Sequence, residues 1–140
     1  MPGERIDKFE QLIAWQKARN LAREIYTMTK GSSFARDFAL AGQLQRSAVS
    51  VMANIAEGFE RNRLAEFHQF LSVAKSSCGE LRSHLYVALD VGYVTKSEFE
   101  RLHNLAEEVG RVVGGLRLSV EKARKRSPKV LSPKVLSTQD

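Results

Sequence analysis

The sequence predicts an all-α protein, folded as an antiparallel, up-down-up-down four-helix bundle. Three observations lead to this prediction. Apolar residues recur every three or four positions in four successive segments, which is the periodicity of a helix with one buried face. The connections between these segments are too short for anything but antiparallel neighbours. The chain also lacks the alternation of apolar and polar residues that is typical of strands.

The first two helices are expected on either side of the stretch "KGSS". Gly31 would supply a left-handed cap for the first helix, and Ser32 or Ser33 the amino-terminal cap of the second. Gly58 and the charged "ERNR" would end the second helix. The first helix would use Phe9, Leu12, Ile13, Trp15, Ala18, Leu21, Ala22, Ile25 and Tyr26 as its apolar face. The second would use Phe38, Leu44, Ala48, Val51, Ile55 and Phe59.

The last two helices meet at the clearest local signal in the sequence. Gly92 is a good carboxyl-terminal cap, and Thr95 and Glu98 form a capping box, flanked by the hydrophobic staple of Val94 and Phe99. The third helix would bury Phe67, Phe70, Leu71, Ala74, Cys78, Leu81, Leu85 and Ala88. The fourth would bury Phe99, Leu102, Ala106, Val109, Val113, Leu116, Val120 and Ala123, and it carries Gly110, Gly114 and Gly115, which suggest close backbone packing.

A boundary is expected after Arg126. Residues 1–126 would form the bundle domain, a size that can bury one hydrophobic core without staples. Residues 127–140 repeat the pentapeptide SPKVL, and their two prolines block continuation of the helix. This segment is predicted to be a disordered, basic tail.

The second helix has more apolar surface than one core requires. At about 100° per residue, Ala48, Val51 and Ile55 fall within roughly 40° of Leu44 and define the core stripe. Between residues 38 and 56 the only formal charge is Arg46. A second face that meets another copy of the chain explains this composition, and the alternative is a helix sunk between its neighbours in one bundle. The predicted oligomer interface consists of Gly42, Val49, Met52, Ala53 and Ala56.

Positive charge is concentrated near the end of the chain. Residues 1–116 hold 15 Lys and Arg against 14 Asp and Glu, and residues 117–140 hold 7 against 2, so most of the net charge of +6 lies in the last part. These charges invite nucleic-acid binding, although those near residue 126 could simply complement a helix dipole. The candidate nucleic-acid-binding residues are Arg46, Arg61, Arg63, Lys75, Arg82, Arg124, Lys125 and Arg126.

No residue set predicts catalysis or a cofactor. A di-iron bundle needs two Glu-x-x-His units, and this chain has one, Glu100 to His103. Cys78 is the only cysteine and lies on the apolar stripe, which suits a core residue in a reducing, cytoplasmic compartment. No apolar run approaches the roughly 18 residues of a membrane span, and no secretory signal is expected. We therefore expect a non-enzymatic protein without metal, cofactor or membrane association.

The stretches "QLQRSAVSVMANIAEGFERN" and "AEFHQFLSVAKSSCGELRSHLYVALDVGY" resemble the four-helix-bundle family encoded in intervening sequences of bacterial 23S rRNA genes, also labelled S23 ribosomal protein. This resemblance implies a homopentameric ring with a structural role and no cofactor. Asn54 and Glu57 match family positions that bond helix ends or neighbouring helices, and Gly58 completes the motif. Gln45 replaces the first arginine of a family pair, and Asn62 is left as the cap of the third helix.

A related branch, the accessory proteins of diversity-generating retroelements, binds nucleic acid and a reverse transcriptase. The resemblance therefore implies RNA or DNA as the leading partner. Binding through phosphate contacts would have only a weak preference for base sequence. The rival hypothesis is a homo-oligomeric scaffold that presents helical surfaces to a protein partner, such as a reverse transcriptase, without binding nucleic acid.

Overall fold

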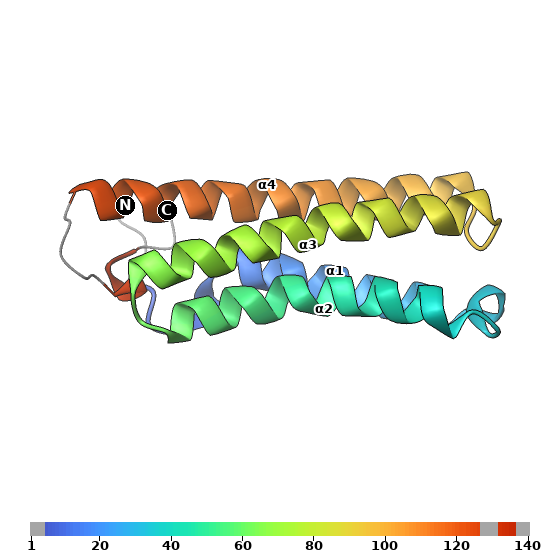
Figure 1. Ribbon diagram of the computed structural model, residues 1–140, viewed down its shortest axis with the longest axis horizontal. Coiled ribbons are helices and arrows are strands. Elements are labelled where there is room, and N and C mark those ends of the chain that lie inside the picture. Colours follow the sequence, from blue (N-terminus) through green and yellow to red (C-terminus); the bar gives the residue numbers. More distant parts are fainter. Residues whose placement is uncertain (1–4, 127–131, 137–140) are drawn as a thin grey trace.

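A computed structural model describes residues 5–126 and 132–136, and this part of the chain contains four long helices and no strand. Each helix runs antiparallel to the next, so the order is up, down, up and down (Figure 1). The predicted all-helical fold is confirmed. The helices are α1 (Ile13–Thr29), α2 (Phe38–Glu60), α3 (Leu64–Asp90) and α4 (Lys96–Arg126), with 3-10 turns η1 (Phe9–Gln11), η2 (Ser32–Phe34) and η3 (Pro133–Val135).

One hydrophobic core runs along the bundle and takes side chains from all four helices. Leu21, Leu44, Leu71 and Leu102, one from each helix, have no exposed surface. Burying a leucine contributes about 1.5–3 kcal/mol, which makes this stripe the main source of stability. α3 packs extensively against both α2 and α4, whereas α1 and α4 share the smallest interface of neighbouring helices.

Two ion pairs close the thinner seam between α1 and α4. The Lys17 ammonium lies 2.6 Å from a Glu108 carboxylate oxygen, and the Arg101 guanidinium lies 3.0 Å from Glu24. The hydrogen bond from Lys17 lowers the pKa of Glu108. These pairs are partly exposed, so each contributes little to the free energy of unfolding and mainly orients the two helices.

The connection between α1 and α2 differs from the prediction. Gly31 has a φ of −64° and is not left-handed, and neither Ser32 nor Ser33 caps α2. Asp37 is the cap instead: its carboxylate accepts a hydrogen bond from the backbone N–H of Leu40 at 3.0 Å. The same carboxylate accepts one from the Tyr93 hydroxyl at 3.0 Å, which ties this connection to the one between α3 and α4.

The connection between α3 and α4 has the predicted form. Gly92 has a φ of +80°, which favours glycine. The Thr95 hydroxyl accepts from the Glu98 N–H at 3.1 Å, and the Glu98 carboxylate accepts from the Thr95 N–H at 3.1 Å. Val94 and Phe99 are both buried. The capping box is therefore confirmed.

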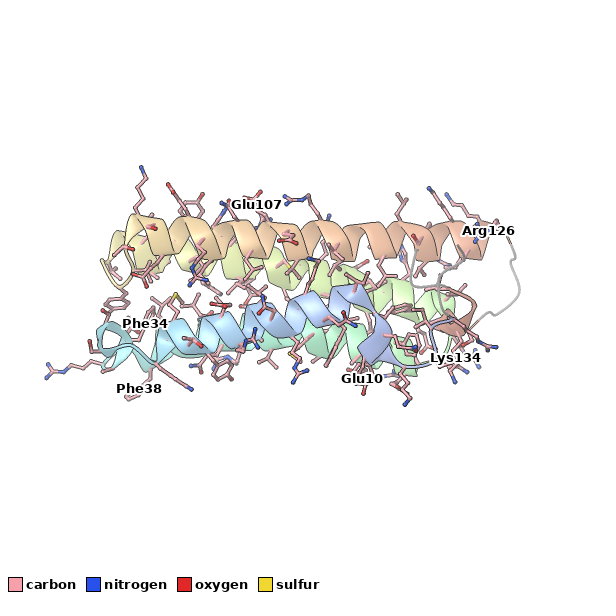
Figure 2. The ribbon with its side chains drawn as sticks, turned by 180° about the vertical axis from the view of Figure 1, so that it is seen from behind. Glu10, Phe34, Phe38, Glu107, Arg126 and Lys134 are labelled. Carbon is pink, nitrogen blue, oxygen red and sulfur yellow. The ribbon has the colours of Figure 1, made fainter. Side chains whose placement is uncertain are left out.

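Three residues assigned to the apolar faces lie largely outside the core. Phe38 is 81% exposed at the bundle end opposite to Arg126 (Figure 2), and Ile13 and Tyr26 are 49% and 41% exposed. Phe38 is the first residue of α2 and lies about 120° around the helix from the core residue Leu44. The three-and-four spacing of apolar residues assigns these side chains to the buried faces of their helices, but they lie outside the stripe that the core covers.

Gly58 does not end α2, which continues to Glu60. It is buried where α2 approaches α3, and a Cβ at this position would lie 2.5 Å from the Phe70 Cβ. The turn is made by Asn62, with a φ of +61°, and α3 begins after Arg63 without a side-chain cap. The predicted cap at Asn62 is therefore wrong. Close packing explains Gly58.

Part of the predicted disordered tail is folded onto the end of the bundle. The backbone N–H of Ile6 donates to the carbonyl oxygen of Leu136 at 3.3 Å, and both side chains are buried. The Ser132 hydroxyl donates to the side-chain oxygen of Asn62. Disorder is thus a wrong prediction for residues 132–136, because burial of Leu136 favours docking. Residues 127–131 and 137–140 of the predicted tail lie outside the described residues.

The Gly58 contact predicts the effect of adding a single methyl group. Gly58→Ala should lower the free energy of unfolding by about 1–3 kcal/mol, because the new Cβ overlaps Phe70 where both backbones are packed. The matched control is Gly115→Ala, where a Cβ meets nothing within 4 Å, and which should stabilise α4 by up to about 1 kcal/mol. Urea denaturation followed by circular dichroism measures both changes. Equal effects at the two positions would contradict the packing argument.

Candidate nucleic-acid interface

The eight candidate basic residues lie at three places. Arg46 is exposed on the outer side of α2, with its guanidinium over Gly42. Lys75 and Arg82 lie on the edge of α3 that faces α4. The others lie at one end of the bundle, where the turn from α2 to α3 and the end of α4 come together (Figure 1). This basic end consists of Arg61, Arg63, Arg124, Lys125 and Arg126.

Much of the positive charge at the basic end is compensated. Three of its five members lie within 4 Å of a glutamate, whereas Lys125 and Arg126 are exposed in the last turn of α4, where the helix dipole favours cations. The pairs are Arg61–Glu57 at 3.3 Å, Arg61–Glu66 at 3.8 Å, Arg63–Glu66 at 3.9 Å and Arg124–Glu121 at 3.0 Å. Such exposed pairs leave the arginines free to exchange a carboxylate for a phosphate.

A cavity of about 200 Å³ opens between α3 and α4. Two of the candidate residues meet there, and a third cation, Arg111 of α4, joins them. The floor is formed by Gly110, where a Cβ would lie 3.6 Å from the Cys78 Cβ. We call this site the α3–α4 cavity, and it is lined by Lys75, Cys78, Arg82, Glu107, Gly110 and Arg111.

A second, more open cavity of about 500 Å³ continues the same groove toward the basic end. Arg117 donates from Nε to the Ser72 hydroxyl at 2.8 Å, and the His68 ring lies 3.3 Å from Glu121. Burial and the nearby Arg117 lower the pKa of His68. The Lys75 Nζ lies 3.0 Å from the position of a Cβ on Gly114, so this side chain lies between the two cavities. The second cavity is lined by His68, Gly114, Arg117, Leu118 and Glu121.

Sequence reasoning missed Arg111 and Arg117. A helical wheel of α4 could have found Arg117, because it falls within about 60° of Gly110 and Gly114 on the edge that meets α3. These glycines do not bring two backbones together, as their spacing suggested. They leave the groove open beside Cys78 and Lys75. Nothing in the described part of the chain explains Gly115, which faces open space.

The predicted oligomer interface is only partly covered within one subunit. Val49 is 39% exposed, Ala53 is exposed, and Gly42, Met52 and Ala56 are half-buried. The alternative of a helix sunk between its neighbours is therefore wrong for Val49 and Ala53. α3 adds apolar surface that sequence reasoning missed, because Val73 and Val87 are 49% and 46% exposed.

Two of the resemblance-derived motif residues make local bonds. The Asn54 amide donates to the Ser50 carbonyl at 2.8 Å and to its hydroxyl at 3.0 Å, and that hydroxyl lies 2.9 Å from the Ser77 hydroxyl of α3. Among the described residues, Asn54 therefore reaches α3 only through Ser50. Glu57 bonds Arg61 within the end of its own helix.

Two side chains that catalysis could use, those of His103 and Cys78, take part in packing in this structure. Nowhere in residues 5–126 and 132–136 do three His, Cys, Asp or Glu gather as metal ligands. The His103 ring stacks on Phe99 and lies 3.0 Å from Glu107. Burial raises the pKa of the Cys78 thiol to about 11, so this group stays protonated at neutral pH. No helix in the described ranges has the length and apolar character needed to cross a bilayer.

Comparison with known proteins agrees with this architecture. A crystal structure from Bacteroides thetaiotaomicron, described as a protein with unknown function from the S23 ribosomal protein family, superimposes with a TM-score of 0.69. The two chains are 22% identical, and the match covers 75% of this chain and 98% of the other, which shows a shared fold. No curated protein matches the sequence. The sequence profile of the 23S rRNA-intervening sequence proteins matches residues 10–115, and the chain therefore belongs to this family.

Proposed function

We propose that this protein is a non-enzymatic ring of identical subunits that binds RNA or other nucleic acid through repeated basic residues. The observation that carries the proposal is the convergence of Lys75, Arg82 and Arg111, from two helices, on one cavity. Across residues 5–126 and 132–136, none of the three has a carboxylate within 4.0 Å. Cations without such partners are available to phosphates.

The position of the remaining basic residues supports the same function. The second cavity leads from Lys75 past Arg117 toward the basic end, so the cations follow one side of the bundle. Phosphate contacts of this kind supply affinity without reading base sequence. The family name refers to 23S rRNA intervening sequences, which makes structured RNA the first nucleic acid to test.

The outer face of α2 supports the ring. Val49 and Ala53 are exposed without being polar, and a sister subunit would remove them from water. A homopentamer is proposed from the family resemblance. A ring repeats the net charge of +6 in every subunit and strengthens the field felt by a polyanion. We place this function in the cytoplasm, because the free, buried thiol of Cys78 is typical of proteins in a reducing compartment.

Binding to nucleic acid should depend steeply on salt. Fluorescence anisotropy with a labelled, structured RNA should show affinity falling by about tenfold or more between about 50 and about 200 mM salt, because each phosphate contact releases counterions. The absence of binding at the lower salt concentration would contradict the proposed function. Capture of a protein partner that persists after nuclease treatment, together with that absence, would favour the scaffold hypothesis.

The ring should come apart when charge is placed on the outer face of α2. Wild-type protein should have a molar mass of about 79 kDa by light scattering, five times the 15.7 kDa of one chain. Ala53→Glu should reduce it toward a single chain, because a carboxylate buried without a partner is costly. Asn104→Glu, on an exposed position of α4, is the matched control and should leave the mass unchanged. A monomeric wild-type protein would contradict the ring.

A further inference from the structure

We propose that the α3–α4 cavity is a site for one phosphate group. This inference deepens the proposed function, on which it rests for the source of the phosphate: the backbone of a bound nucleic acid. Free inorganic phosphate has the same chemistry and is the other source. The charge of the cavity, an unsatisfied donor on its lining residue Arg82, and the size of the cavity point to this ligand.

The charge of the cavity favours an anion. Lys75, Arg82 and Arg111 line it together with a single carboxylate, that of Glu107. This carboxylate lies 3.0 Å from the His103 Nδ1, which partly occupies it. Arg82 and Lys75 also oppose the rise that burial causes in the pKa of Cys78, so both cations lie close enough to this lining residue to act on its thiol. Three cations around one glutamate leave an excess of positive charge.

Arg82 contributes a donor that the described residues do not satisfy. Its Nε is buried and has no hydrogen-bond partner within residues 5–126 and 132–136. A buried N–H without an acceptor destabilises the protein, so a turn of the guanidinium that brings this N–H to a ligand oxygen in the cavity would be favoured. The planar guanidinium presents its donors in a fork that matches two oxygens of a phosphate.

The size of the cavity limits the ligand. Its volume of about 200 Å³ is below the roughly 300–1,000 Å³ of pockets that enclose drug-sized molecules, so it can hold a phosphate group but is too small to enclose a whole nucleotide. Gly110 keeps this space free at a position inside α4, where glycine disfavours the helix. The bases of a bound strand would therefore lie outside the cavity, which agrees with weak sequence preference.

The phosphate site is tested first with inorganic phosphate. The Arg82 Nε–H signal, assigned by its loss in Arg82→Gln, is followed by NMR during titration with sodium phosphate at constant ionic strength. We expect a saturable shift in the wild-type protein and none when sodium chloride replaces the phosphate. Gly110→Leu fills the cavity and keeps all three cations, so it should abolish the shift. An unchanged shift in Gly110→Leu, or none in the wild type, would overturn the site.

RNA affinity then identifies the source of the phosphate. Lys75→Gln combined with Arg82→Gln should weaken RNA binding by about tenfold or more. The control removes the same charges from exposed positions of the α1–α2 connection, as Lys30→Gln with Arg36→Gln, and should weaken binding by less than threefold. Equal losses would overturn the site while nucleic-acid binding stands. A phosphate shift without any RNA binding would support the site for free phosphate and overturn the proposed function.

Discussion

The close approach of α2 and α3 at Gly58 determines how the rest of the bundle is arranged. With no side chain at this position, the two helices meet directly against Phe70, and the Ser50–Ser77 hydroxyl contact continues the interface along both helices. This contact joins one side of α3 to α2. On the side of α3 that meets α4, Cys78 is buried, and Lys75 and Arg82 lie beside it along the cavity. The tight packing of α3 on α2 and the cations that line the cavity therefore lie on different sides of the same helix.

On α4 the groove stays open because two of its lining positions have no side chain. Gly110 and Gly114 occupy the edge of α4 that faces α3, and neither is required by a turn or by contact between backbones. Larger residues would fill the space beside Cys78 and displace Lys75. The same helix buries Val109 and Val113 completely, so core packing and an open outer groove coexist within one turn. Stability and a binding surface therefore depend on different sides of α4.

The sequence predicted the helices, the capping box and most of the core, because periodicity and local hydrogen bonding decide these features. Leu44 and Val51 are buried as their spacing requires, and Thr95 and Glu98 bond as predicted. Features that depend on distant segments were missed. Asp37 caps α2 while it holds Tyr93, 56 residues away, and Arg111 joins Lys75 only because two helices meet. Disorder was predicted for Leu136 because prolines nearby mark a break, and periodicity gives no sign of a docking place.

The contact between Ile6 and Leu136 brings the two ends of the described chain together at one end of the bundle. The described backbone therefore begins and ends at nearly the same place, beside the basic end. A short linker could join these two points without changing how the helices pack. A circularly permuted chain, joined there and opened within the α1–α2 connection, would keep every helix between its present neighbours. In this permuted chain α2 would be synthesised first and α1 last, while the arrangement of the four helices would stay the same.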